Sequence, residues 1–466
     1  MNQVKFLTQA FVADNLIEAE IEEGTESSSA SLEKLILNLK KTPLLPAFSA
    51  HALLFIQQLS KQLLKDPTCK AFPELIALGF WLRKSNLHKL LQQQGFGHQP
   101  VEEEEPSAGK KPSAGKKPSA GKKPSAGKEP SDSRKPLGLV IHFTPANVDT
   151  MFIYSWIAAL LLGNCSIVRV ASKDSELQTL LLTIINQLFS MKEHQEIARR
   201  NCFISFSKQG DNTALLCVHA NARLIWGGDQ SVAAILSHSA PKECVDLCFA
   251  DKFSAAILAG INDNNLKNTA QMLWRDTQPY LQQACSSPRI LYWLKSNDND
   301  KTHLLALLAE LNVHAQNNRQ SDWHSLSQAN EHLVTAQQIM ATSSENHQPE
   351  LLTLATVSGL QVKHISKQML ELHTGNGFFI CKLCENIDAV FTDIAKLNNT
   401  KLQTLSYCNL RPEVLIKQKQ VHWILGIDRI VPLGQALDFS FYWDGYDLLR
   451  ELSRKNNDET MLTESI

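Results

Sequence analysis

The fold is decided by residues 137–170, which read LGLVIHFTPANVDTMFIYSWIAALLLGNCSIVRV. Two short apolar segments rich in β-branched side chains, at 137–143 and 166–170, flank a longer apolar segment at 149–162. The short segments predict buried strands, and the longer one predicts a buried helix. A strand, a helix and a second strand in this order predict a right-handed crossover between two parallel strands.

The same alternation continues along the chain. Further helices are expected at 174–189 and 229–236, and further strands at 202–206, 223–226, 254–258, 290–294, 351–357 and 378–383. Strands that alternate with helices predict an α/β fold with parallel sheets covered by helices. Ligands of such sheets bind at the carboxyl ends of the strands.

The run from Thr150 to Val168 contains no charged residue and approaches the length of a membrane-spanning helix. Gly163-Asn164 interrupts this run, and the segment that follows has the pattern of a strand. We therefore interpret the run as a buried helix followed by a buried strand, and we expect no membrane span.

Residues 1–100 predict a helical N-terminal section that carries no chemistry. Residues 101–136 differ, because after four glutamates the unit PSAGKK starts at positions 106, 112, 118 and 124. Proline and glycine in each unit oppose helix and sheet, so we expect a disordered insertion. Its basic residues could attract nucleic acid or anionic lipid, but a solvated loop explains them without a partner, and we expect no nucleic acid ligand.

The composition indicates a soluble globular protein. The chain has 466 residues, 43% of them hydrophobic and 20% charged, which suits about three domains or two large ones. A net charge of −1 gives no overall attraction to nucleic acid or to an anionic membrane. The ten cysteines form no dense framework and the N-terminus lacks a secretory pattern, so we expect reduced thiols and a cytoplasmic location.

Cys285 is the candidate for chemistry. An amphipathic run at 264–284 precedes it and an apolar, strand-like run at 290–294 follows it, so the side chain lies at a helix-to-strand junction. As a nucleophile it would react as the thiolate. The alternative is a buried cysteine that serves as a small apolar residue.

Three stretches together resemble the aldehyde dehydrogenase superfamily. They are Thr144-Pro145-Ala146-Asn147 with the helix and the Gly163-Asn164 turn behind it, Trp226-Gly227-Gly228-Asp229, and Gln283-Ala284-Cys285. More narrowly, residues 137–454 resemble the long-chain acyl-CoA reductases, or fatty-acid reductases, of bacterial bioluminescence operons (LuxC type). The segments that carry this likeness are Gln282-Gln283-Ala284-Cys285-Ser286-Ser287-Pro288, Phe249-Ala250-Asp251-Lys252-Phe253-Ser254, Gln403-Thr404-Leu405, Arg411-Pro412-Glu413, Ile427-Asp428-Arg429-Ile430 and Trp443-Asp444-Gly445.

The resemblance implies an aldehyde-dehydrogenase-like fold. A Rossmann-type dinucleotide-binding domain is expected at 137–240 and an α/β catalytic domain at 241–408. A C-terminal section at 409–466 is expected to return to the cofactor domain.

The resemblance also implies a reductase that turns long-chain fatty acyl thioesters into fatty aldehydes through an acyl group on Cys285. The acyl donor would be acyl-CoA or an acylated protein partner such as an acyl-protein synthetase, and a homo-oligomer is expected. Asn147 and the backbone N–H of Cys285 would stabilise the oxyanion. The alternative role for Asn147 is the N-cap of the following helix, although Asp149 could serve there instead.

The cofactor expected from the resemblance is NADPH. The matching positions place Thr144, Arg169, Ser172, Lys173, Gly227 and Gly228 at the cofactor. Ser172 stands where NAD-dependent relatives carry a glutamate that would repel a 2′-phosphate, and Arg169 and Lys173 would attract one. The alternative is that Arg169 and Lys173 are surface residues without a ligand.

One departure from the hydrolytic aldehyde dehydrogenases favours reduction. Cys248 aligns with the glutamate that activates water in those enzymes, although a shifted alignment would place Glu243 there. Two alternatives stay open: an aldehyde-oxidising or acyl-phosphate-reducing relative, and a non-redox acyl-transfer subunit. The pair Cys381 and Cys384 has the spacing of a zinc motif but no second pair, so we expect core residues and no metal.

Overall fold

The computed structural model describes residues 4–12, 15–17, 29–96, 134–172, 175–207, 210–296, 298–317, 322–343, 348–398 and 401–455. The expected insertion at 101–136 lies outside the described residues, apart from its last three. These three form strand β4 (Arg134–Pro136), so the expectation that the whole segment lacks sheet structure is wrong at its end.

The first sheet has six strands in the order β1-β7-β6-β5-β8-β9. All neighbouring pairs are parallel except β1 with β7. The chain order of its last five strands, with β5 in the middle and reversal between β5 and β8, is that of a doubly wound dinucleotide-binding fold. The strands are β1 (Val4–Phe6), β5 (Leu139–Phe143), β6 (Cys165–Arg169), β7 (Asn201–Phe206), β8 (Ala222–Trp226) and β9 (Val245–Phe249).

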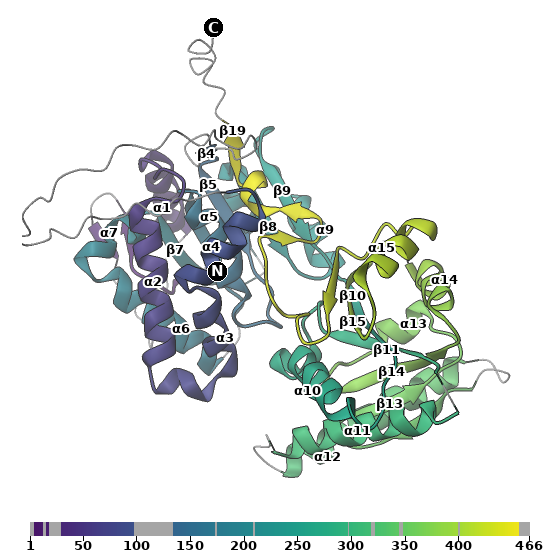
Figure 1. Ribbon diagram of the computed structural model, residues 1–466. Helices are drawn as coiled ribbons and strands as arrows, with labels where there is room; N and C mark the ends of the chain where they lie inside the picture. The colour runs from purple at the N-terminus through teal and green to yellow at the C-terminus, as the bar shows by residue number, and fades with distance from the viewer. Residues whose placement is uncertain are drawn as a thin grey trace, which may run out of the picture.

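Helices cover both faces of this sheet (Figure 1). The helices that connect its strands are α5 (Met151–Leu161), α6 (Glu176–Phe189), α7 (Gln195–Ala198), α8 (Asn212–His219) and α9 (Asp229–Leu236). Helix α5 is buried along its whole length, as the charge-free run predicts. Among the described residues, every helix is too short or too polar to cross a lipid bilayer.

The N-terminal section is helical, as expected, but it also contains three short strands. Strand β1 pairs with β7 of the first sheet, and β2 (Ala10–Val12) and β3 (Asn15–Ile17) pair with each other as a short hairpin. Helix α1 packs against α8, whereas the next three pack around α5 and α6 through contacts such as that of Phe55 with Trp156. These helices are α1 (Ser29–Lys41), α2 (Ala50–Lys65), α3 (Pro73–Trp81) and α4 (Lys84–Gln93).

The second sheet has seven strands in the order β12-β13-β14-β11-β10-β15-β16, and only β12 is antiparallel to its neighbour. The expected strand at 351–357 is two separate strands, β12 and β13. The strands are β10 (Phe253–Leu258), β11 (Pro288–Leu294), β12 (Glu350–Thr353), β13 (Ser358–Gln361), β14 (Phe378–Cys384), β15 (Leu402–Cys408) and β16 (Arg429–Pro432).

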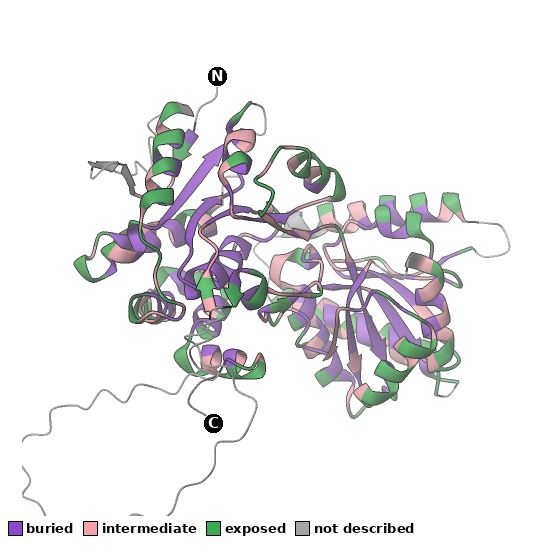
Figure 2. Cartoon of the chain, turned by 90° about the horizontal axis from the view of Figure 1, so that it is seen from above, coloured by how far each residue is buried: buried purple, intermediate pink, exposed green. Residues whose placement is uncertain are grey.

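Helices enclose this second sheet from both sides, and two separate apolar cores result. Figure 2 shows buried strands in the middle of this layer and exposed helix faces outside them. The helices are α10 (Leu266–Thr277), α11 (Asp300–Asn317), α12 (Asp322–Thr342), α13 (Lys367–Glu371), α14 (Ile387–Asn398) and α15 (Pro412–Val421).

The chain passes from one sheet to the other later than expected at both boundaries, 240/241 and 408/409. Strand β9 lies beyond the expected boundary at residue 240 and still pairs with β8, so the chain leaves the first sheet only after Phe249. Residues 409–432 stay with the second sheet, because β16 pairs with β15. The return to the first body comes later, where β17 (Tyr442–Trp443), β18 (Tyr446–Asp447), α16 (Leu448–Glu451) and β19 (Ser453–Lys455) follow.

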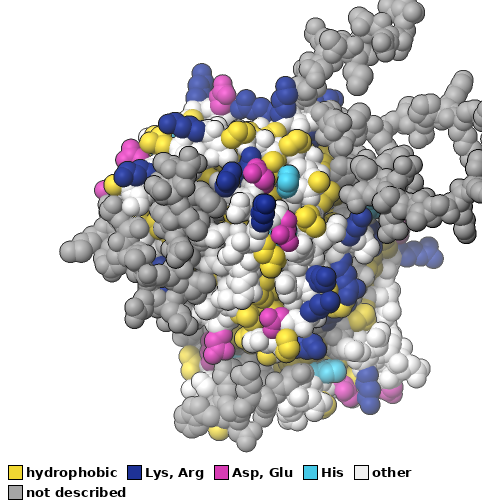
Figure 3. Space-filling view, turned by 90° about the vertical axis from the view of Figure 1, so that its left-hand side faces the viewer, with side chains coloured by type: hydrophobic (Ala, Val, Ile, Leu, Met, Phe, Trp, Pro, Cys, Tyr) yellow, Lys and Arg dark blue, Asp and Glu magenta, His cyan; other side chains and the backbone are white. Residues whose placement is uncertain are grey.

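Apolar packing holds this returning segment in place. Leu448 and Leu449 join the core that contains α5, and the Trp81 indole donates to the Phe439 carbonyl at 3.0 Å. Strand β19 pairs with β4. On the face in Figure 3, acidic and basic side chains are interspersed, and hydrophobic side chains lie in small separate patches and in a narrow line near the centre.

Candidate functional site

A cavity of about 1050 Å³ lies where the two sheets meet. The last residues of five strands of the first sheet line it: Phe143, Arg169, Phe206, Trp226 and Phe249. The second body contributes the segment before β10 and the segment that carries Cys285 into β11. The volume is at the upper end for a small-molecule site, about 300–1,000 Å³, and the position at the carboxyl ends of parallel strands is the one expected for a ligand.

Cys285 follows a strained turn. Helix α10 ends at Thr277, so the expected amphipathic run to residue 284 is wrong in its last turns. Tyr280, Leu281 and Gln282 have φ angles of 62°, 50° and 60°, in the left-handed region that residues other than glycine rarely adopt. Such a conformation persists only where the surroundings enforce it.

Side-chain amides enforce this turn. Gln282 donates to the Pro288 carbonyl at 2.7 Å and accepts from the Gly377 N–H at 2.9 Å. Gln283 donates to the Thr374 carbonyl. The Ser254 hydroxyl donates to the carbonyl of Cys285 itself at 2.6 Å. Hydrogen bonds of three side chains, those of Gln282, Gln283 and Ser254, therefore hold the backbone that carries Cys285.

Cys285 lines the cavity and is partly buried. Burial, assisted by the nearby Asp444 carboxylate, raises the pKa of the thiol to about 11, while Arg289 and the Gln403 amide act in the opposite direction. The Gln403 Nε2 lies 3.7 Å from Sγ and also donates to Asp444. At neutral pH the thiol is therefore protonated.

Asn147 lies beside the nucleophile segment, where its Nδ2 donates to the Gln283 carbonyl at 2.9 Å. Its alternative role as the N-cap of α5 is wrong, because Thr150 occupies that position and no side chain caps the helix. Asp149 does not cap it either, and it accepts from the Ser175 hydroxyl at 2.8 Å. Asn147 and Cys285, which are far apart in the sequence, thus line one cavity.

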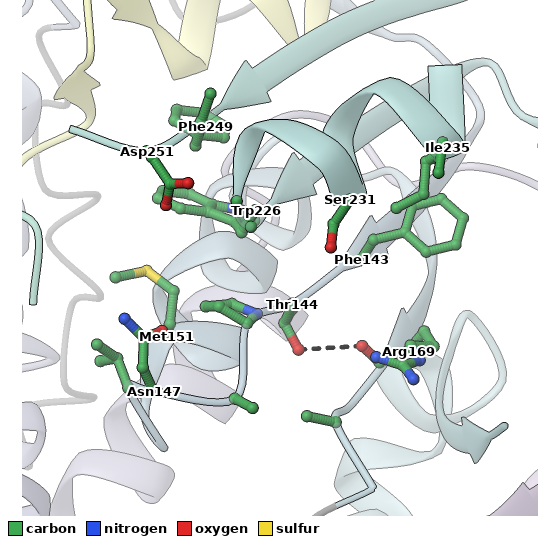
Figure 4. A pocket seen from close by; sticks show the side chains of 18 of the residues that line it. Phe143, Thr144, Asn147, Met151, Arg169, Trp226, Ser231, Ile235, Phe249 and Asp251 are labelled. Carbon is green, nitrogen blue, oxygen red and sulfur yellow. Dashed lines mark hydrogen bonds between the residues drawn. The ribbon is translucent and has the colours of Figure 1, made fainter. Parts of the chain in front are cut away.

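Five of the six expected cofactor residues line the same cavity: Thr144, Arg169, Ser172, Gly227 and Gly228. Lys173 lies outside the described residues. The Thr144 hydroxyl donates to the Arg169 carbonyl at 3.0 Å (Figure 4), and the Arg169 guanidinium donates to the Phe206 carbonyl at 3.2 Å. The Ser172 hydroxyl pairs with that of Ser205 at 2.7 Å.

Asp251 was not expected at this site. Its carboxylate accepts from the Asp229 N–H at 3.2 Å, at the start of α9, and it points into the cavity beside Trp226 and Phe249 (Figure 4). These two rings are stacked, with centroids 3.7 Å apart. The first turn of a helix attracts negative charge, so Asp251 has to turn aside if a phosphate group is to bind there.

A charged cluster behind Cys285 was also missed. The Lys252 Nζ lies 2.6 Å from Asp428 and 3.8 Å from Asp444, and all three side chains are largely buried. Burial raises the pKa of the Asp444 carboxyl, and Lys252 counteracts the shift. The stretches that contain these residues carry the resemblance stated above, but nothing in their local pattern shows that they meet.

The two candidates for a water-activating base lie away from the chemistry. Glu243 precedes β9, at the end of the strand opposite the cavity, and pairs with Arg454 at 3.3 Å. Cys248 packs against the apolar core that contains Ile141 and Ile225, and it does not line the cavity. Among the described residues that line the cavity, Asp251 is the one carboxylate.

All ten cysteines are free, and Cys381 and Cys384 are buried in β14. Within the described ranges, no group of three or more His, Cys, Asp or Glu side chains is placed to hold a metal ion.

Solved structures that are similar to this chain have the aldehyde dehydrogenase fold. Aldehyde dehydrogenase 21 from Physcomitrella patens, in complex with succinate, superposes with a TM-score of 0.60 at 11% identity, over 97% of this chain and 98% of that one. The glyceraldehyde-3-phosphate dehydrogenase GapN from Methanocaldococcus jannaschii, complexed with NADP, gives 0.59 at 12% identity, over 97% of each chain. The expected fold class is confirmed.

Curated relatives are similar over a shorter region. A long-chain acyl-protein thioester reductase from Photorhabdus luminescens is 27% identical over 183 residues, which are 39% of this chain and 36% of the relative. One from Aliivibrio fischeri is 24% identical over 165 residues, 35% of this chain and 33% of the relative. The aligned part thus spans about a third of the length of these relatives.

A family model described as acyl-CoA reductase (LuxC) matches residues 118–455. This match covers most of the chain, including both sheets, Asn147 and Cys285, and the protein therefore belongs to the acyl-CoA reductase (LuxC) family.

Proposed function

We propose that the protein reduces long-chain fatty acyl thioesters to fatty aldehydes, with NADPH as the reductant and Cys285 as the acyl carrier. The observation that carries this proposal is the single cavity that brings Cys285 and Asn147 to the strand ends of a dinucleotide-binding sheet. The names of the curated relatives support the acyl thioester as the substrate class. We also propose that the first sheet holds the dinucleotide and the second carries the nucleophile.

The first half-reaction moves the acyl group to the enzyme. The Cys285 sulfur attacks the thioester carbonyl, a carbon–sulfur bond forms, and the bond to the donor's sulfur breaks. The proton that Cys285 loses goes to the departing thiolate. The Asn147 amide has two N–H groups, and within the described residues one of them donates to the Gln283 carbonyl. The other, with the backbone N–H of Cys285, would stabilise the oxygen that becomes negative.

The second half-reaction releases the aldehyde. A reduced nicotinamide supplies the hydride when it is bound. Cys285 then leaves as a thiolate and takes up one proton, so one acyl-cysteine, one hydride and one proton yield aldehyde and free thiol. Neither Glu243 nor Cys248 lines the cavity, and Asp251, the one carboxylate among its described lining residues, is held by the Asp229 N–H at the start of α9. This arrangement supports reduction of the acyl group over its hydrolysis.

The choice of NADPH over NADH is supported by the charge of the side chains expected near the 2′-phosphate. Ser172 places a hydroxyl where a carboxylate would repel the 2′-phosphate, and the Arg169 guanidinium lines the same end of the cavity. The acyl donor is either acyl-CoA or an acylated protein partner, and supply of aldehyde to a luminescence reaction is one use. We expect a homo-oligomer.

The experiment that tests this proposal incubates the purified protein with tetradecanoyl-CoA and NADPH. Tetradecanal should form in equal amount to the NADPH consumed. If the protein instead forms fatty acid from tetradecanal and NADP⁺ and does not reduce tetradecanoyl-CoA, an aldehyde-oxidising enzyme is supported. Transfer of the acyl group without consumption of NADPH would support a non-redox acyl-transfer subunit.

A further inference from the structure

Arg289 lines the cavity with Cys285, and its guanidinium has no partner in the part of the chain that the structure describes. It is the second residue of β11, four residues after the nucleophile. Its Nε is fully buried and makes no hydrogen bond. The charge of Cys285 and, more weakly, that of the Asp251 carboxylate are close enough to act on Arg289, and the charge of Arg289 acts on the thiol in return.

The other buried arginines of this chain are well supplied with acceptors. Arg223 forms a bidentate ion pair with Asp246, in which Nε and Nη2 each donate to a carboxylate oxygen at 2.6 Å. It also donates to the His238 carbonyl. Arg200 donates to Glu196 at 2.8 Å and to the Pro43 carbonyl at 2.7 Å. A buried cation without such partners is costly, so it is normally retained where an anion binds or forms. Arg289 is therefore distinct from the structural arginines of the same protein.

We infer that Arg289 is a catalytic residue whose guanidinium pairs with the negative charge that arises at Cys285, first on the sulfur and then on the oxygen of the attacked acyl group. This inference rests on the proposed function for its second part only. Asn147 and the Cys285 backbone offer neutral N–H donors, whereas Arg289 offers a full positive charge, and hydrogen bonds to an ionised donor are about twice as strong as neutral ones.

The charges around the thiol support this division of roles. Asp444 faces Cys285 from the returning C-terminal segment and opposes ionisation, whereas Arg289 faces it from β11 and favours ionisation. The charge of the thiolate also acts on Arg429, on β16, but the Arg429 guanidinium already donates hydrogen bonds to the Ala436 and Asp438 carbonyls. Of these two arginines, Arg289 is the one that lines the cavity and has a guanidinium Nε without a hydrogen bond.

The test measures alkylation of Cys285 by iodoacetamide at pH 9 in the full-length protein, without acyl donor or cofactor, and locates the adduct by peptide mass spectrometry. Arg289→Gln should slow alkylation at Cys285 by about tenfold, because one unit of thiol pKa changes the thiolate fraction tenfold. Arg289→Lys should restore part of the rate. Arg454→Gln, which changes an exposed arginine on β19, should leave it unaltered.

Thermal unfolding of the same variants separates a catalytic from a structural role. Arg289→Gln removes a partly buried charge whose Nε makes no hydrogen bond, so its Tm should equal or exceed that of the wild type. A Tm several degrees lower, or an alkylation rate equal to that of the wild type, would contradict the inference. A loss of NADPH affinity with unchanged alkylation would assign Arg289 to a phosphate of the cofactor instead.

Failure of the proposed function is recognised separately. If Cys285 takes up no acyl group from tetradecanoyl-CoA while its alkylation still depends on Arg289, the proposed function is wrong and the pairing of Arg289 with the thiolate stands.

Discussion

The side-chain amide of Asn147 donates to the backbone carbonyl of Gln283 at 2.9 Å. This hydrogen bond joins the turn after β5, on the first sheet, to the residue two positions before Cys285. The strand ends of the first sheet and the nucleophile segment are therefore tied to each other directly. Any shift of one sheet against the other would disturb the geometry around the thiol.

Asn147→Ala should lower kcat by about 10²–10³, because removal of one oxyanion donor has an effect of that size. The side chain is exposed, so the Tm should change little. Steady-state reduction of tetradecanoyl-CoA measures the first quantity. Asn262→Ala, in an exposed turn beyond the opposite end of β10, is the control and should retain full activity. Undiminished turnover in Asn147→Ala would exclude the oxyanion role.

Asp444→Asn should make Cys285 more reactive. The carboxylate raises the thiol pKa, so its replacement by a neutral amide lowers that pKa and increases the thiolate fraction at a given pH. Asparagine tolerates the φ of 51° at this position and can still accept from Gln403. Iodoacetamide alkylation should be severalfold faster in the variant at pH 9. A slower reaction would show that Asp444 serves as the base that removes the thiol proton.

The rate at which iodoacetamide alkylates Cys285 in the wild type should follow the ionisation of the thiol as the pH changes. The rate should rise about tenfold per pH unit below the thiol pKa of about 11 and level off above it. Since the folded-state pKa lies above the ordinary value of 9.0, the stability linked to this group is fully present below pH 9. It is lost as the pH rises toward 11. Other buried cysteines with a raised pKa, such as Cys165 and Cys408, add to the same trend, so unfolding in urea at several alkaline pH values should show a smaller loss of stability in Cys285→Ala than in the wild type.

Ser172→Glu should reduce the preference for NADPH over NADH by about tenfold or more, because the new carboxylate repels the 2′-phosphate at close range. The ratio of kcat/KM for the two cofactors measures the effect. Ser207→Glu, elsewhere on the cavity wall, serves as a comparison for the addition of charge alone. Strong NADH preference in the wild type would refute the assignment of this end of the cavity.

Lys252→Met should destabilise the fold by about 3 kcal/mol, because it leaves the buried Asp428 and Asp444 carboxylates without their cation. Lys301→Met is a matched control, since Lys301 forms an exposed pair with Glu350 at 2.7 Å and should contribute less than about 1 kcal/mol. Denaturant unfolding monitored by fluorescence compares the two. Equal losses of stability would show that burial of the cluster adds nothing.

The sequence predicts the elements better than their assembly. Residues 166–170 and 174–189 are found as β6 and α6 within two residues, because long apolar runs set the periodicity and Ser175 caps the helix. The three-residue strand β1 lies in a mixed segment and carries no such pattern. Strand β9 belongs to the first sheet because it pairs with β8. The local sequence pattern does not reveal this pairing.

The site was predictable where a motif marks it. Asn147 and Cys285 were found through the turn and nucleophile segments that resemble a known family, and the structure brings both to one cavity. The left-handed turn before Cys285 contains none of the glycine or asparagine residues that usually signal such a turn. Arg289, Gln403 and Asp444 come from separate segments, and only tertiary packing places their charges and amides around the thiol.

The most direct test of the account is intact-protein and peptide mass spectrometry after incubation with tetradecanoyl-CoA, without NADPH, on the wild type and on Cys285→Ala. We predict one tetradecanoyl group per wild-type chain, located on the peptide that contains Cys285, and none on the variant. The adduct should disappear when NADPH is added, with release of tetradecanal. An adduct on another cysteine, or equal labelling of Cys285→Ala, would contradict the account.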